Sequence, residues 1–146
     1  MRFAIDAYAT PLTDAGLLVG RMLLAWIFLH EGVYLLMNFD AAALSMAKAG
    51  VPSFALAATV ALQLAAGLSI AAGFWTRLGA GALALFCLMT ATAFHTNFAI
   101  RNELLHFEKD LALAGGLIVL MIHGAGAWSA DAIVMRSAPR LTLHRF

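Results

Sequence analysis

The sequence has little cysteine and little charge, and each shortage excludes a class of protein. Cys87 is the only cysteine in 146 residues, so neither a disulfide framework nor a CxxC metal or redox motif can form. Charged residues make up 12% of the chain, the formal net charge is +1 and the basic residues are scattered, which gives no nucleic-acid signal. Hydrophobic residues make up 63%, a share typical of an integral membrane protein rather than a water-soluble domain.

Four apolar stretches have the length of about 20 residues that a helix needs to cross a bilayer core. They lie at 16–37, 54–75, 78–98 and 107–128. Because they fill most of the chain, we predict a single membrane domain, 1–146, of the all-α class. The short turn at 73–77 makes the second and third helices antiparallel neighbours, and the whole is predicted to be a four-helix bundle running up, down, up and down.

The segments outside these stretches carry helix start and stop signals. Thr13 or Asp14 can cap the first helix at its start. The first connection ends in Gly50-Val51-Pro52, a turn signal, and we expect 41–49 before it to form a short helix on the membrane surface. Cys87 is expected to be a small buried hydrophobic residue.

The positive residues orient the predicted bundle. With four spans, both termini and the turn at Arg77 lie on one side. Five arginines share that side: Arg2, Arg77, Arg136, Arg140 and Arg145. The opposite side holds three basic residues: Lys48, Arg101 and Lys109. By the positive-inside rule both termini are predicted to be cytoplasmic.

Polar residues within the spans form two layers at different depths. The outer layer includes Glu31, His95 and the charged stretch 106–110; at about 100° per residue, His106, Lys109 and Asp110 share one helix face, with Glu108 roughly opposite. The inner layer holds Arg21, Arg77, His123 and Asp131, with Gln63 between the layers. A charge near the bilayer core costs several kcal/mol unless it is paired or hydrated, so the outer cluster is either a structural lock or a site.

Several motifs occur in a characteristic order along the chain. They are GRMLLAWIFLHEG (20–32), GVP (50–52), GFWTR (73–77), FH (94–95), HFEKDLALAGG (106–116), GAG (124–126) and Asp131. In this order, over about 16–131, the chain resembles the DoxX family of small four-span membrane proteins. The matching polar positions are Arg21, Arg77, His95, His106, Lys109 and Asp131. Three residues depart from the family pattern: Leu35, Gln63 and Asp110.

The resemblance implies a four-helix bundle in a bacterial inner membrane and an association with redox chemistry. One relative in that family is the membrane subunit of a thiosulfate:quinone oxidoreductase, and other members accompany membrane-bound or secreted redox enzymes. Many members have no assigned activity, so the resemblance leaves open whether this chain is catalytic.

A quinone site is one interpretation of the outer layer. It needs a hydrogen-bond donor for each carbonyl and a proton route, which imidazoles and desolvated carboxylates can supply near neutral pH. The predicted catalytic residues are Glu31, His95, His106, Lys109 and Asp110. The predicted cofactor-binding residues, including aromatic walls for the ring, are Trp26, His30, Gln63, Phe94 and Phe107.

The alternatives assign these residues other roles. In a structural lock, Lys109 pairs with Glu31 or Asp110 across helices, and Arg21, Arg77 and Asp131 form a second lock by snorkelling and salt bridges. A bis-imidazole haem between His30 and His95 is a weaker interpretation, since no HxxxH pair accompanies it. No metal site is predicted.

Two classes of function follow. In the first, the chain is a redox-linked membrane subunit that binds quinone and works with an oxidoreductase partner, since it has no flavin, nucleotide or Fe–S motif of its own. In the second, it is a noncatalytic accessory or scaffold subunit whose small-residue faces dock a partner or a second copy. Both place the chain in the lipid bilayer.

Overall fold

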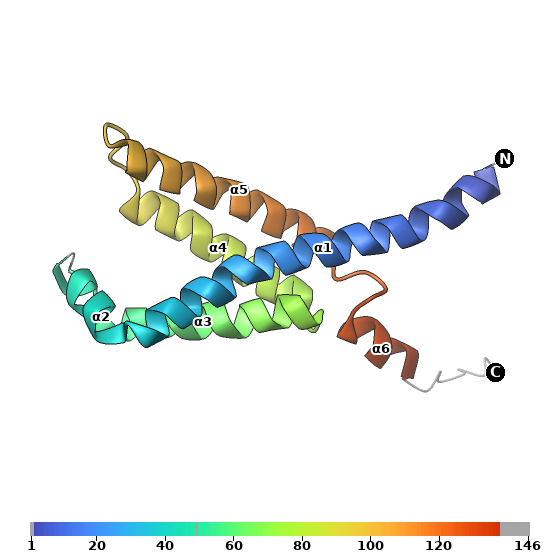
Figure 1. Ribbon diagram of the computed structural model, residues 1–146, viewed down its shortest axis with the longest axis horizontal. Coiled ribbons are helices and arrows are strands. Elements are labelled where there is room, and N and C mark those ends of the chain that lie inside the picture. Colours follow the sequence, from blue (N-terminus) through green and yellow to red (C-terminus); the bar gives the residue numbers. More distant parts are fainter. Residues whose placement is uncertain (1, 49, 138–146) are drawn as a thin grey trace, which may run out of the picture.

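The computed structural model describes residues 2–48 and 50–137, with side chains at 11–48 and 50–136. Within these ranges the chain is all-helical and contains no strand (Figure 1). Six helices follow one another: α1 (Arg2–Met37), α2 (Phe39–Lys48), α3 (Ser53–Ala72), α4 (Thr76–Phe94), α5 (Arg101–His123) and α6 (Ala130–Ser137). The all-α class is therefore confirmed.

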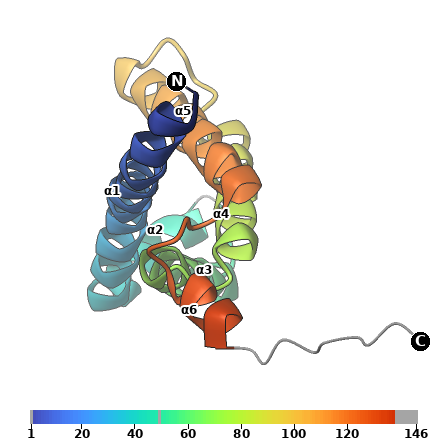
Figure 2. The ribbon, with the colours of Figure 1, turned by 90° about the vertical axis from the view of Figure 1, so that its right-hand side faces the viewer.

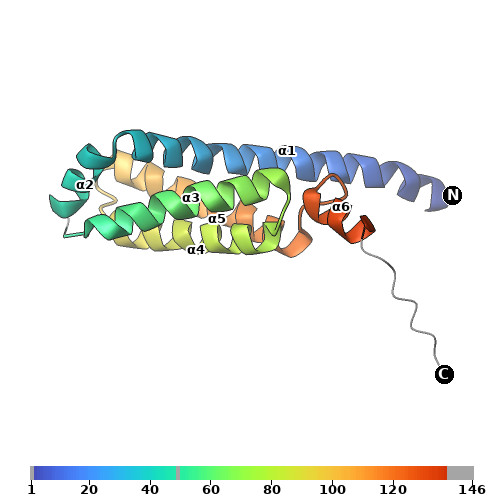
Figure 3. The ribbon, with the colours of Figure 1, turned by 90° about the horizontal axis from the view of Figure 1, so that it is seen from below.

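The four long helices lie side by side and associate as two pairs. α1 packs along α3, α4 packs along α5, and α3 joins the pairs by packing on α4, whereas α1 touches α5 much less (Figures 2 and 3). The short helices mark the two ends of the molecule. We call them the α2 end, where α1 and α4 finish and α5 begins, and the α6 end, which holds the 73–75 turn and the 124–129 loop.

In the part of the chain that the structure describes, three helices are long and apolar enough to cross a membrane: Pro11–Met37, Ser53–Ala72 and Thr76–Phe94. They agree with the first three predicted spans. α5 is longer than the second and third of these, but the consecutive charges Glu108, Lys109 and Asp110 lie within it and lower its hydropathy. The fourth predicted span, and with it the four-span bundle, therefore remains a prediction.

Several helix ends differ from the sequence-based expectation. Thr13 and Asp14 do not cap a helix start, because α1 begins at Arg2 and continues past Pro11. The third long helix, α4, ends at Phe94 rather than at 98. The fourth, α5, ends at His123 rather than at 128, because the next residue, Gly124, leaves the helix with a φ of +81°.

Other local predictions can be compared directly. The short helix expected at 41–49 is α2, which covers Phe39–Lys48, and Ala49 lies outside the described residues. Of the arginines that orient the chain, Arg140, Arg145 and the side chain of Arg2 also lie outside the described part.

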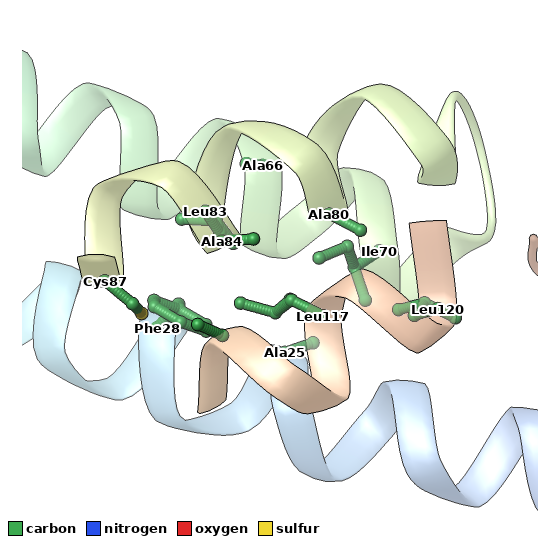
Figure 4. Close-up of a cluster of buried hydrophobic side chains, with 11 residues drawn as sticks. Ala25, Phe28, Ala66, Ile70, Ala80, Leu83, Ala84, Cys87, Leu117 and Leu120 are labelled. Carbon is green, nitrogen blue, oxygen red and sulfur yellow. The ribbon is translucent and has the colours of Figure 1, made fainter. Parts of the chain in front are cut away.

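A hydrophobic core joins the four long helices near the middle of the molecule. Phe28 from α1, Ile70 from α3, Leu83 from α4 and Leu117 from α5 are almost completely buried against one another (Figure 4). Cys87 belongs to the same cluster at 2% exposure, so the expectation of a small buried residue is confirmed. This core separates two groups of polar side chains, one toward each end of the molecule.

Candidate functional site

A cavity of about 330 Å³ lies between α1, α3, α4 and α5 toward the α2 end. Its apolar walls include Phe28, Leu35, Phe86 and Leu113. Eight polar side chains line it together: Glu31, Thr59, Gln63, Thr90, His95, His106, Lys109 and Asp110. The structure thus brings all five predicted catalytic residues and one predicted cofactor-binding residue, Gln63, to a single cavity. Their chemical roles remain predictions.

The two histidines are held in a chain of polar contacts. His95 Nδ1 lies 2.9 Å from Glu103 Oε2, and the His95 and His106 rings stack with centroids 5.1 Å apart. Lys109 Nζ donates to His106 Nδ1 at 3.2 Å. Because a ring nitrogen that accepts a hydrogen bond carries no proton, the proton of a neutral His106 is on Nε2.

Asp110 is the most deeply buried acid of the cavity. It is 8% exposed, and its Oδ2 accepts a hydrogen bond of 3.0 Å from Thr90 Oγ1 on the neighbouring α4. Thr90 Oγ1 also lies 3.0 Å from the carbonyl oxygen of Cys87. Sequence reasoning did not single out Thr90, because a threonine within an apolar helix carries no signal of a partner on another helix.

The remaining polar groups of the cavity are not neutralised by one another. Across 11–48 and 50–137, His95–Glu103 is the only ion pair. The predicted lock, in which Lys109 pairs with Glu31 or Asp110, is therefore not formed by these side chains. Gln63 is 4% exposed, yet its Oε1 has no hydrogen-bond partner. A buried amide oxygen of this kind costs about 1–3 kcal/mol, which makes it a position where a ligand donor would be stabilising.

Four of the five predicted cofactor-binding residues lie elsewhere. Trp26 and His30 stack on each other on the outward face of α1, where Trp26 is 70% exposed. Phe94 is exposed at the end of α4, and Phe107 packs edge-on against Phe98. These residues have the expected depth but point away from the cavity, because the neighbouring helix faces, and not sequence position, decide which side chains point inward.

The geometry also bears on the haem and metal alternatives. His30 faces outward from α1 whereas His95 lines the cavity, so the two imidazoles do not face a common space. In the described part of the chain, no group of three His, Cys, Asp or Glu side chains is arranged to hold a metal ion.

The inner polar layer holds the 124–129 loop in place. Arg21, 4% exposed, donates to the carbonyl oxygens of Ala125 at 3.0 Å and Trp128 at 2.5 Å. Asp14 Oδ1 accepts from the backbone N–H of Ala127 at 2.8 Å. Two side chains of α1 therefore bind the loop backbone from one side.

Asp131 connects the same region to the α3–α4 turn. Its Oδ1 accepts from the backbone N–H of Trp75 at 3.1 Å, and its own N–H donates to the carbonyl of Gly73 at 2.9 Å. Arg21 and Asp131 therefore bond to backbone groups, and the salt bridges predicted for the inner lock of Arg21, Arg77 and Asp131 do not form among the residues that the structure describes. His123 Nδ1 donates to the carbonyl oxygen of Val119 at 3.0 Å, so this polar group has a partner on its own helix.

The Thr90–Asp110 bond provides a test of how the cavity is held. Replacing Thr90 by valine removes the hydroxyl and leaves the buried Asp110 with one hydrogen bond fewer, so we expect the free energy of unfolding to fall by about 2 kcal/mol. Thr92→Val is the matched control, because the Thr92 hydroxyl bonds only to carbonyls of its own helix. Unfolding in mild detergent measures both; equal losses would show that the bond to Asp110 contributes nothing.

Comparison with known proteins agrees with the ordered motifs. A family model described as DoxX matches residues 16–96. The chain is 38% identical over 123 residues to the inner membrane protein YqjF of Escherichia coli K12, covering 84% of this chain and 95% of that protein. It is 34% identical over 122 residues to the inner membrane protein YphA of the same organism, covering 79% and 87%. No solved structure matches. On the family match and on both relatives, the chain belongs to the DoxX family.

Proposed function

We propose that the cavity at the α2 end binds a quinone headgroup, and that the chain is a redox-linked subunit of a bacterial inner-membrane oxidoreductase. One observation carries the proposal. Lys109, Glu31 and Gln63 reach the same cavity from three helices; neither Lys109 nor Glu31 forms an ion pair with the residues described at 11–48 and 50–136, and Gln63 Oε1 has no hydrogen-bond partner among them. Polar groups that only hold helices together are expected to be paired, whereas groups that receive a ligand keep free donors and acceptors.

The residues present fit a quinone headgroup in size and chemistry. The volume of about 330 Å³ falls at the lower end of the range for small-molecule pockets. A quinone accepts two electrons and two protons to become a quinol. Lys109 and His106 supply donors for one carbonyl oxygen, and the Gln63 amide, from the opposite helix pair, supplies a donor for the other. Phe28 and Phe86 offer apolar walls for the ring.

The titratable side chains of the cavity can move protons. His95 and His106 stack on each other, and His95 contacts Glu103, which lies outside the cavity lining. Hydrogen bonds join Glu103 to His95 and Lys109 to His106, and the two imidazoles meet by ring stacking, so a proton route through them uses a water molecule between the rings. The electrons must come from or go to a partner, because the sequence has no motif for a second redox group.

The proposed arrangement in the membrane uses α5 as the fourth span of an antiparallel bundle. Its charged residues 108–110 then lie near one membrane surface, at the α2 end. Both termini would be cytoplasmic by the positive-inside rule, which places the cavity toward the outer surface. The printed names of both relatives, inner membrane proteins, support the bacterial inner membrane as its location.

Binding of a short-chain ubiquinone tests the proposal directly. Lys109→Gln and Glu31→Gln each remove a charge that lines the cavity, and we expect the Lys109 change to weaken quinone binding by about tenfold or more, as for the loss of one charge-assisted hydrogen bond. Glu31→Gln should affect binding less and proton uptake more. Native mass spectrometry of the purified chain, titrated with the quinone, measures the bound fraction.

Glu108→Gln is the matched control for both variants. Glu108 lies on α5 beside Lys109 but is exposed and does not line the cavity, so the variant should bind quinone like the wild type. Wild-type binding by a folded Lys109→Gln protein would refute the assignment of the cavity. So would equal weakening in the Glu108 variant.

A noncatalytic scaffold is the second candidate. The bonds Thr90–Asp110 and His95–Glu103 favour it, because each holds α4, or the loop that follows it, to α5. A scaffold would bind no quinone, and substitutions in the cavity would change stability without changing the turnover of a partner enzyme.

A further inference from the structure

A second cavity, of about 660 Å³, lies at the α6 end, on the other side of the core. It is formed by the 73–75 turn, the start of α4, the 124–126 loop and α6. We propose that this pocket binds one anionic phospholipid, with the phosphate on the Arg77 guanidinium and an acyl chain against the apolar wall. The proposal does not depend on quinone binding at the opposite end.

Arg77 is a free cation at the edge of this pocket. It lines the cavity and forms neither a hydrogen bond nor an ion pair with any residue in 11–48 and 50–137. A guanidinium carries five donors in a planar fork that matches two phosphate oxygens. The acid in the lining, Asp131, forms no ion pair with Arg77; its Oδ1 accepts instead from the backbone N–H of Trp75.

A second arginine, Arg21, adds positive charge next to the pocket. Arg21 is almost fully buried, and both of its hydrogen bonds go to carbonyl oxygens, those of Ala125 and Trp128. Carbonyl dipoles stabilise a guanidinium but leave its net charge in place. The pocket lining, which includes Ala125, therefore lies next to a cation that forms no ion pair with any carboxylate of the described residues.

The walls favour a lipid over a free anion. Phe74 and Trp75 stack with centroids 5.6 Å apart, and both are exposed, as are Leu78, Val134 and Met135 around them. Trp at the end of a membrane span marks the depth of the headgroups, where one part of a side chain is apolar and another polar. A free phosphate would gain nothing from these walls, whereas the chain of a phospholipid would cover them.

The absence of a side chain at Gly124 leaves room for the Arg77 side chain. A Cβ at Gly124 would lie 3.3 Å from Arg77 Nε, and the residue has a φ of +81° that side chains rarely adopt. The Arg77 side chain can therefore rest against the bare loop backbone. Basic pockets of this kind between membrane helices are suited to anionic headgroups.

The test compares two arginines at the same end of the molecule. The full chain is delipidated in mild detergent and titrated with phosphatidylglycerol, and native mass spectrometry counts the bound lipid. We expect one lipid per chain and an apparent affinity about tenfold lower for Arg77→Gln. Arg136→Gln removes the same charge from exposed α6, outside the pocket lining, and should leave binding unchanged.

Each outcome decides the question. Equal weakening by both variants would mean general surface attraction and would overturn the site, as would equal retention of phosphatidylcholine and phosphatidylglycerol. If inorganic phosphate displaces the lipid at equal concentration, the pocket holds an anion and not a lipid, and the proposal fails. Should Arg77→Gln not fold, Arg77→Lys, which keeps the charge but loses the fork, is expected to reduce binding by a smaller factor.

Discussion

Replacing Gly73 by alanine is expected to lower the free energy of unfolding by about 3 kcal/mol, as the sum of backbone strain and overpacking. Gly73 ends α3 with a φ of +71°, where a side chain is strained whatever the space around it. A Cβ there would also lie 2.3 Å from Arg21 Nη1 and 2.6 Å from Ser129 Cβ. Thermal unfolding in mild detergent, followed by tryptophan fluorescence, measures the loss.

Gly50→Ala separates the two contributions. Gly50 has a similar φ of +76°, but nothing lies within 4 Å of the Cβ it would acquire. Its replacement should therefore cost about 1 kcal/mol, the backbone part alone. If Gly73→Ala and Gly50→Ala lowered the free energy of unfolding by the same amount, the close packing of Arg21 and Ser129 over Gly73 would contribute nothing to the cost.

Arg21→Lys is expected to cost about 2 kcal/mol, because a buried charge is kept while at least one of its hydrogen bonds is lost. The guanidinium reaches two carbonyl oxygens, those of Ala125 and Trp128, from one rigid fork. A lysine ammonium at the end of a shorter chain cannot occupy both positions. The variant leaves the net charge unchanged, so the measured difference reports geometry rather than the cost of burying a charge.

The control is Arg77→Lys, at the same end of the molecule. Arg77 is exposed and makes no bond within the described ranges, so in lipid-free detergent its replacement should change the free energy of unfolding by less than about 0.5 kcal/mol. An Arg21→Lys protein as stable as the Arg77→Lys protein would show that the 124–129 loop is held by other contacts.

The sequence was enough to predict at what level along its helix a residue lies, but not to which side its side chain points. The apolar runs locate the long helices, and counting residues along them puts Glu31, His95 and Lys109 at one level, where the structure brings them to one cavity. The same counting puts Trp26 and His30 at that level as well. They lie on the outward face of α1, because it is the packing of α1 on α3 that selects which face turns inward.

A sequence pattern also does not show when the hydrogen-bond partner of a charged side chain is a backbone group. Arg21 and Asp131 were expected to form salt bridges, since opposite charges are the visible partners in a sequence. Their actual partners are backbone groups presented by the 124–129 loop and the 73–75 turn. The glycines at 124 and 126, both with positive φ, permit this loop shape, and the GAG motif was the only available sign of it.

The two hydrogen bonds of Arg21 can form only late in biosynthesis. Their acceptors, Ala125 and Trp128, follow Arg21 by 104 and 107 residues, so nearly the whole chain must leave the ribosome before the guanidinium can be satisfied. Until then α1 holds a cation without its final partners, while the α3–α4 turn and the α4–α5 pair can already form from local contacts. A nascent chain that stops before residue 125 therefore carries, in its first helix, a guanidinium without these two acceptors.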